Sequence, residues 1–494
     1  MNLITLEIAV VILAIAVLLG DLWTPVAQKR KLGYAAAFGL ILIFIYSFIG
    51  EPESGLAFNK MFVADELAIF FKRFFLAAAV IVIFIAIEFS ERIESGISEF
   101  YSLILFALTG MLFAASANDF VLVFVALELI SVTFYVLNSF QRNRLISLEA
   151  GIKYLILSAL SAAFLVFGIA FIFGTTTFTN FHEIRSLLMR SPEFITNPAF
   201  LLGILFVIVG LGFKIAAFPF QIWAPDVYQG SPAPATAFLA VGSKAAGIIL
   251  LLRVLFTAVP QVALHWNKLL IAIAAITILY GNLCAIPQRN LKRLLGYSSV
   301  ANAGYLLLGF AALNQSGFSA ILYYLCGYLF AVLVAFMVIT LVTRGRESDD
   351  ISVLAGLSQR SPLLAACLTL AMVSLAGIPP LAGFFGKFLL LKAVVEQGAK
   401  NSAYYWLVGI AIVGVVISLY YYFGVIRAIY WSKDPADLTP VVVSLPAKAV
   451  LLVCAAGMLY LGLFPNRLVQ HTQDAVKVLR INSPVAEIQK AMRP

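Results

Sequence analysis

Long uninterrupted apolar runs limit what this chain can fold into. Runs such as Val10–Leu19, Val80–Ile87 and Ile271–Tyr280 contain no charged residue. Of the 494 residues, 62% are hydrophobic and 12% are charged, whereas soluble domains average about 25% charged residues. A membrane-spanning helix needs roughly 20 mostly apolar residues, while the strands of a membrane barrel alternate apolar and polar residues. The sequence therefore predicts an all-α integral membrane protein.

The apolar runs between polar breaks predict about fourteen transmembrane helices. We expect them near residues 3–22, 33–50, 66–87, 98–116, 119–140, 150–173, 198–219, 232–258, 267–286, 297–313, 317–343, 362–398, 402–430 and 446–464. The basic cluster Lys29-Arg30-Lys31 follows the first run, whereas a cleavable signal peptide carries its positive charge in front. The positive-inside tendency places this cluster in the cytoplasm and the N-terminus outside. An even number of spans returns the C-terminus to the outside.

Charge and cysteine usage exclude several classes of function. The basic residues behind the net charge of +9 are scattered along the chain, which suits loops near anionic lipid and gives no support to nucleic-acid binding. The four cysteines stand singly, without a C-x-x-C pair, which argues against iron–sulfur ligation. The three histidines lie in connecting segments. We therefore expect neither a cofactor nor a metal in this chain.

Proline interrupts the apolar pattern at two places. The first is Gly212–Pro219, continued by a second proline at Pro225, and the other is Ala376–Lys387, which contains Pro379-Pro380. Proline removes a helical hydrogen-bond donor, so each helix should break there. Helices broken at matching places in two halves are typical of transporters built from repeats. We expect three N-terminal helices in residues 1–97, five-helix units in 98–258 and 259–430, and the last helix and tail in 431–494.

Ionisable residues inside the predicted spans are the candidate functional residues. Glu128 and Lys244 lie near mid-membrane, Lys214 directly precedes one break, Lys387 follows the other, and Lys153 lies shallower. A charge at the bilayer centre costs roughly 2.5–3.5 kcal/mol on insertion scales. These side chains should therefore face one another or water inside the bundle.

A purely structural interpretation accounts for only part of this pattern. Glu128 and Lys214 could form an ion pair, and snorkelling to the interface explains Arg253, Lys268 and Lys392 near span ends. One carboxylate, however, cannot neutralise three deep lysines. Loss of hydration or a neighbouring cation favours a neutral amine over an ammonium, so such lysines can release and rebind protons. We therefore favour a proton relay.

Two amides and a tryptophan lie close to this set. Gln221 and Asn302 could extend a hydrogen-bonded chain, since amides both donate and accept. Alternatively, they satisfy backbone groups freed by the breaks. Trp223, near a predicted span end, is expected to anchor at the membrane interface.

Four segments resemble a known family. They are Phe213–Gly230 (FKIAAFPFQIWAPDVYQG), Ser243–Ala246, Asn290–Ser299 and Leu375–Lys387. They closely resemble the hallmark motifs of subunit N of the proton-pumping NADH-quinone oxidoreductase (respiratory complex I), one of its antiporter-like membrane subunits. The resemblance covers about residues 100–430. It implies fourteen helices with two inverted five-helix repeats, each containing a broken helix.

The resemblance also implies roles for the charged residues. Glu128 and Lys214 would form a coupled pair, Lys244 the link and Lys387 the exit-side lysine. Many relatives are expected to carry histidine where this chain has Gln221 and Asn302. The chain would translocate protons as a membrane-arm subunit, coupled to electron transfer from NADH to quinone elsewhere.

Partners and location follow from the same resemblance. The partners would be the lipid bilayer and other membrane-arm subunits, including paralogous antiporter-like ones. FMN, iron–sulfur clusters and quinone would belong to partner subunits. The protein would lie in a bacterial inner membrane with both termini periplasmic. The alternative is a subunit of a multisubunit cation/proton antiporter, which shares the buried lysines.

Overall fold

A computed structural model describes residues 3–49, 54–346, 348–399, 401–431 and 438–479 of the chain. Apart from short 3₁₀ segments, its elements in chain order are α1 (Thr5–Gly20), α2 (Arg30–Ile49), β1 (Gly55–Ala57), β2 (Phe62–Ala64), α3 (Glu66–Phe89), α4 (Ile97–Ala115), α5 (Phe120–Asn138), α6 (Leu145–Thr176), α7 (Phe181–Arg190), α8 (Pro198–Ile215), α9 (Trp223–Gly230), α10 (Ala233–Phe238), the π segment η5 (Leu239–Ser243), α11 (Lys244–Arg253), the π segment η6 (Val254–Ala258), α12 (Ala263–Ala285), α13 (Leu291–Ala311), α14 (Gln315–Val342), α15 (Leu357–Arg360), α16 (Pro362–Ala376), α17 (Ala382–Gly398), α18 (Ala403–Tyr430), α19 (Leu445–Leu463) and α20 (Pro465–Val476). The strands form one antiparallel hairpin between α2 and α3.

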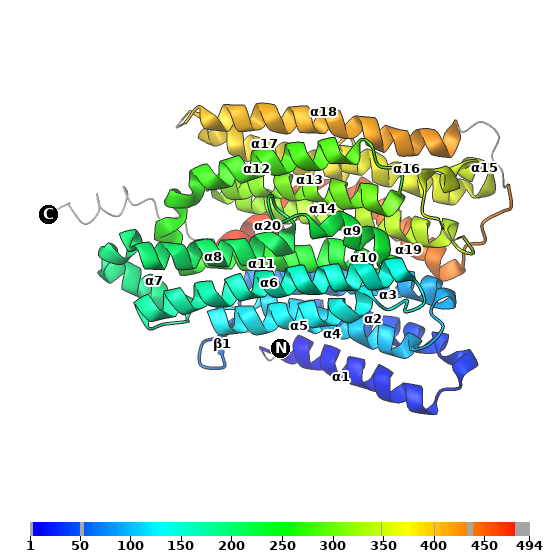
Figure 1. The fold of residues 1–494 in the computed structure, drawn as a ribbon, viewed down its shortest axis with the longest axis horizontal. Helices are drawn as coiled ribbons and strands as arrows, with labels where there is room; N and C mark the ends of the chain where they lie inside the picture. The colour runs from blue at the N-terminus through cyan, green and yellow to red at the C-terminus, as the bar shows by residue number, and fades with distance from the viewer. Residues whose placement is uncertain (1–2, 50–53, 347, 400, 432–437, 480–494) are drawn as a thin grey trace.

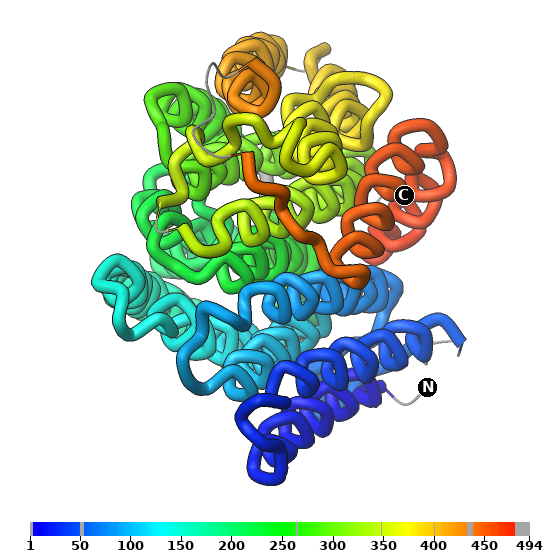
Figure 2. The backbone as a smooth tube through the Cα atoms, turned by 90° about the vertical axis from the view of Figure 1, so that its right-hand side faces the viewer, coloured from blue at the N-terminus to red at the C-terminus, as the bar shows by residue number. Residues whose placement is uncertain are grey.

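The long helices lie side by side along one axis, as a bundle that spans a membrane requires (Figure 1). Seen end-on, α1 and α2 form one edge of the bundle and α18 lies at the opposite edge (Figure 2). Within the described ranges, thirteen helices are long and apolar enough to cross a membrane. The expected span 362–398 is divided into the shorter helices α16 and α17. Counted together as one interrupted span, they bring the thirteen to about fourteen. The prediction of a multi-pass all-α membrane protein is confirmed.

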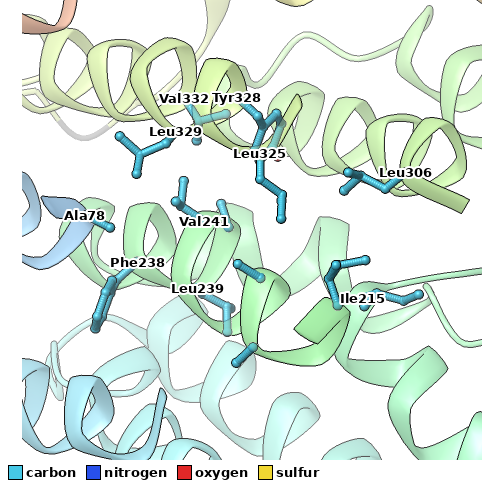
Figure 3. Packing of buried hydrophobic residues seen from close by; sticks show 14 of the residues in the cluster. Ala78, Ile215, Phe238, Leu239, Val241, Leu306, Leu325, Tyr328, Leu329 and Val332 are labelled. Atoms are coloured by element: carbon cyan, nitrogen blue, oxygen red, sulfur yellow. The ribbon is translucent and has the colours of Figure 1, made fainter. Parts of the chain in front are cut away.

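The middle of the bundle is formed by the segment α10–α11 together with α13 and α14. The most apolar window of α10–α11 is completely buried, whereas α1, α2 and α6 keep most side chains at the surface. Figure 3 shows apolar side chains of α14, including Leu325 and Leu329, facing Val241 of η5 across this interface. A largely apolar helix can be buried on every side in such a place, because it meets neighbouring helices in every direction.

Small residues permit the closest helix contacts. A Cβ added to Gly168 on α6 would lie 2.6 Å from the carbonyl oxygen of Gly203 on α8. Close backbone approach at small residues is the usual basis of helix association in membranes.

Polar side chains cap the first turns of several helices. Asp65 accepts the Ala68 N–H at the start of α3, and Asn290 accepts the Arg293 N–H at the start of α13.

Both predicted breaks are present, and both follow a residue in the left-handed conformation. α8 ends at Ile215 and is followed by Ala216 with φ of 57°. α16 ends at Ala376 and is followed by Gly377 with φ of 86°. A Cβ at Gly377 would also lie 2.9 Å from the Lys387 side chain, and glycine adopts this backbone conformation without steric cost. The division at 97, 258 and 430 and the inverted relation of the two units stay predictions, and residues 480–494 of the expected tail lie outside the described residues.

Candidate functional site

Lys214 lies in the last turn of α8, directly before the first break. Its side chain is 5% exposed. The ammonium donates to Ser131 Oγ of α5 at 2.7 Å, and to Tyr154 Oη and Ser158 Oγ of α6 at 3.3 Å each. Three hydroxyls therefore accept hydrogen bonds from this buried lysine, and no carboxylate of the described residues lies within ion-pair distance.

Glu128 lies one turn before Ser131 on α5, near enough to Lys214 for electrostatic attraction. It is half-buried and follows the same helical stripe as the exposed Val121, Val125 and Val132. Within the described part of the chain it makes no ion pair. The carboxylate thus borders the lateral surface of the bundle and makes no direct contact with Lys214, and the coupling of the two residues stays a prediction.

Lys244 is the first residue of α11, directly after the π segment η5. Its ammonium donates to the backbone carbonyl of Ser299 at 2.6 Å and to the Ser299 hydroxyl. The same hydroxyl oxygen accepts from Tyr328 at 3.0 Å and forms a 3.0 Å hydrogen bond with Tyr228. Through these contacts Ser299 of α13 links α9, α11 and α14 around the buried side chain of Lys244. π segments are frequent at functional sites.

Lys387 occupies the second turn of α17, beyond the second break. It is 4% exposed and donates to the carbonyls of Leu375 at 2.7 Å and Ala376 at 3.2 Å. Its ammonium also lies 4.7 Å from the centre of the Tyr305 ring. The two carbonyls belong to the last turn of α16, where a helix leaves acceptors without internal donors. The lysine of one half-helix thus caps the other.

Asn302 is buried on α13, one turn beyond Ser299. Its carbonyl oxygen accepts the Tyr324 hydroxyl at 2.6 Å, and its amide donates to Ser298 Oγ at 3.4 Å. α13 therefore presents a polar stripe from the Lys244 contact towards Tyr305. Asn302 therefore shares a helix with Ser299, the acceptor of Lys244, but among the described residues its side-chain partners are Tyr324 and Ser298 rather than a lysine.

Gln221 lies in the non-helical segment between α8 and α9. Its backbone carbonyl accepts the Ala224 N–H at 3.0 Å, which helps to begin α9. Its side-chain Oε1 is buried and receives no hydrogen bond within the described residues. This free acceptor beside the first break is available to a hydrogen-bonded chain.

Lys153 is separate from the buried lysines. Its side chain is 40% exposed and lies 2.7 Å from both Glu149 Oε1 and Asp226 Oδ2. Asp226 also pairs with Arg293. Burial opposes ionisation of Asp226, but the hydrogen bonds from Lys153 and Arg293 outweigh it and hold the pKa of this carboxyl below its usual value. The structure thus places Lys153 in a surface ion-pair cluster beside α9, and its role in the relay stays a prediction.

Two predictions about the interface are wrong. Arg253 does not snorkel, because it is 1% exposed and makes two hydrogen bonds to Asp65, at 2.7 and 3.0 Å, and one to the Ala115 carbonyl. Trp223 is also buried, and its indole N–H donates to the Phe213 carbonyl at 3.0 Å. Both side chains lie inside the bundle because their hydrogen-bond acceptors are there. The Ala115 and Phe213 carbonyls belong to the last turns of α4 and α8, where carbonyl groups lack helical donors, and Asp65 directly precedes α3.

An ion pair near the N-terminus was missed by sequence reasoning. Lys72 of α3 and Glu7 of α1 are each 1% exposed and lie 2.7 Å apart. Both stand inside apolar runs, so the general rule that intramembrane charges are significant could have found them. The pair ties α1 to the rest of the bundle.

The Arg253–Asp65 contact should contribute strongly to stability. We expect Arg253→Met to lower the melting temperature of the purified chain, because breaking a buried ion pair costs about 3–5 kcal/mol. Adding Asp65→Asn should recover part of the loss, since asparagine keeps the helix cap and removes the unpaired charge. Thermal unfolding in detergent measures both. A single variant no less stable than the double variant would contradict this assignment.

The side chains gathered around the two breaks are of kinds that can hold a proton and pass it on. Lysines, serines and tyrosines supply groups that both donate and accept. Among the described residues there is no group of three or more histidine, cysteine or acidic side chains that could hold a metal ion. The breaks in α8–α9 and α16–α17 place a lysine beside freed backbone groups in each half.

Comparison with known proteins identifies the family. The family model described as “NADH:quinone oxidoreductase/Mrp antiporter, TM” matches residues 117–418. “NADH-quinone oxidoreductase subunit N” of Heliobacterium modesticaldum is 39% identical over 481 residues, covering 97% of this chain and 99% of that protein. “F(420)H(2) dehydrogenase subunit N” of Methanosarcina mazei is 34% identical over 491 residues, covering 96% and 98%.

A solved structure agrees in fold and sequence. A chain of respiratory complex I from Thermus thermophilus with bound aureothin matches with a TM-score of 0.78 and 31% identity, covering 94% of this chain and 99% of that chain. These relatives extend over nearly the whole length of the chain. The chain belongs to the NADH:quinone oxidoreductase/Mrp antiporter family of transmembrane proteins, and within it to the subunit N proteins.

Proposed function

We propose that this chain is a membrane-arm subunit of a NADH-quinone oxidoreductase and translocates protons through Lys214, Lys244 and Lys387. One observation carries the proposal. Each of these buried ammonium groups is bonded to hydroxyls or backbone carbonyls, and none has a carboxylate within ion-pair distance among the described residues. Ionisable side chains inside membrane spans, facing the bundle interior, commonly mark proton pathways.

An unpaired ammonium in this setting is poised to release its proton. Three such charges would together cost about 8–10 kcal/mol on insertion scales if they faced lipid. Transfer of the proton to a neighbouring hydroxyl chain or water relieves that cost. The Lys214 stem packs beside Gly247 of α11, one turn from Lys244, and the α13 stripe leads on to Tyr305 and Lys387. The relay thus follows buried polar groups across the bundle.

The position of Glu128 supports a partner subunit against α5. A carboxylate on a stripe with exposed valines is costly against lipid. Another membrane-arm subunit, such as a paralogous antiporter-like one, would cover this face and change the field at Lys214. FMN, iron–sulfur clusters and quinone would then be held by partner subunits. The membrane would be the bacterial inner membrane, with both termini on the periplasmic side.

The alternative function is cation/proton exchange in an Mrp-type antiporter, since the family model carries both names. The relatives that match over nearly the full length favour the oxidoreductase. Purification of the chain with its native partners tests this. We expect co-purifying flavin and iron–sulfur subunits, and quinone-dependent acidification of vesicles on addition of NADH. A complex without redox subunits that exchanges Na⁺ for protons would overturn the proposal.

Removing the charge of Glu128 should slow pumping without breaking the fold. In Glu128→Gln the attraction that favours the Lys214 ammonium is gone, so we expect proton translocation several-fold below wild type, with Glu128→Asp less affected. Vesicle acidification per electron transferred is the measurement. Glu183→Gln, which removes an exposed carboxylate from α7, is the control and should pump as wild type. Wild-type pumping by Glu128→Gln would show that the carboxylate plays no part.

A further inference from the structure

A cavity of about 280 Å³ opens on the surface of the bundle between α2, α3, α14 and α20. Its walls are mostly aromatic and aliphatic, and include Phe44, Phe70, Phe74, Leu329, Phe330 and Leu468. Leu329 lies fourteen residues into α14, which is about 21 Å along a helix. The cavity therefore runs from one end of the bundle towards mid-membrane. We refer to it as the α3–α14 groove.

Arg73 brings a cation to the end of this groove nearest the end of α2, and no described carboxylate neutralises it. Its guanidinium donates twice to the Ser47 carbonyl, at 2.7 and 3.2 Å, and stacks 4.2 Å from the centre of the Phe48 ring. Ser47 lies in the last turn of α2, so the guanidinium sits level with the end of the span. No carboxylate of the described chain is within ion-pair distance of it. Nε and Nη2 of the guanidinium donate to Ser47, and Nη1 remains available to an anion.

Glu66 adds a negative charge to the same groove. It lies two turns before Arg73 on the same face of α3, and it is exposed. The two side chains interact electrostatically but do not form a direct ion pair. His471 of α20 completes the polar rim. The rim thus offers one cationic and one anionic group above an apolar channel.

We propose that the α3–α14 groove binds one phospholipid with an amine head group, of the phosphatidylethanolamine type. The phosphate accepts from Arg73, the ammonium lies against Glu66, and an acyl chain follows the phenylalanines towards Leu329. Both signs of charge at the rim select a zwitterionic head group over a purely anionic one. Guanidinium groups bind phosphate well because their planar fork matches its oxygens.

Native mass spectrometry of the full-length chain in detergent tests head-group recognition. We expect one tightly held phosphatidylethanolamine, an affinity at least tenfold weaker in Arg73→Met, and loss of the preference over phosphatidylglycerol in Glu66→Gln. Ala77→Phe, which fills the channel below the rim, should also weaken binding. Lys268→Met, which removes an exposed cation from α12, is the control and should bind as wild type. Unchanged binding in Arg73→Met and Ala77→Phe, or a wild-type preference for phosphatidylglycerol, would overturn the proposal.

A photocrosslinking residue at position 330 tests the occupant in native membranes. Benzoylphenylalanine in place of Phe330 should yield an adduct with the mass of a phospholipid after illumination of the assembled protein. Arg73→Met in the same background should reduce that adduct. A crosslink to another polypeptide instead would mean that a protein helix occupies the groove, and the lipid proposal would fail.

Discussion

A Lys214→Met variant should assemble normally and pump protons at less than about a tenth of the wild-type rate. Methionine keeps the volume and the apolar stem of lysine but carries no proton. Positioned acid–base groups typically contribute about 10²–10⁴-fold to a proton-transfer step. The fold should persist, because Ser131 Oγ still donates to the Leu127 carbonyl at 2.6 Å. Acidification of proteoliposomes, normalised to electron transfer, is the measurement.

A second lysine on the membrane domain provides the control for that experiment. Lys392→Met removes an exposed lysine from α17 and should leave both assembly and pumping unchanged. Normal pumping by Lys214→Met would remove this residue from the relay. Loss of assembly in Lys214→Met alone would instead assign it a structural role as the partner of three hydroxyls.

The breaks and the deep lysines could be predicted because their causes are local. Pro219 and Pro379 stand inside apolar runs, where proline removes a helical hydrogen-bond donor and interrupts the helix. Lys214 and Lys387 stand in apolar segments, where the cost of a lipid-facing charge forces them inward. Local chemistry and the bilayer together were sufficient for these features.

The partners of these lysines could not be predicted, because they depend on tertiary packing. Serine and tyrosine are common in membrane helices, and nothing in the sequence distinguishes Ser299 as the acceptor of Lys244. The expected direct Glu128–Lys214 contact is replaced by hydroxyls of α5 and α6, since Glu128 follows the outer stripe of α5. Arg253 was expected to snorkel because its acceptor, Asp65, is distant in sequence.

Lys387 should be as critical as Lys214, but its role is harder to isolate because it also caps α16. Lys387→Met would leave the Leu375 and Ala376 carbonyls without this donor, at a cost of about 1–3 kcal/mol each. A loss of pumping in that variant could therefore reflect a weakened break. Lys387→Gln separates the two roles, because an amide still donates N–H groups to carbonyls but does not titrate.

We expect Lys387→Met to be less stable and not to pump, and Lys387→Gln to be close to wild type in melting temperature and still not to pump. The comparison rests on the geometry of the second break, where, among the described residues, the Lys387 ammonium contacts the Leu375 and Ala376 carbonyl oxygens and the Tyr305 ring. If capping were its whole function, the glutamine variant would pump normally, since the acceptors would be satisfied. If the lysine carries the proton, no neutral donor can replace it, and recovery of stability without recovery of pumping is the signature.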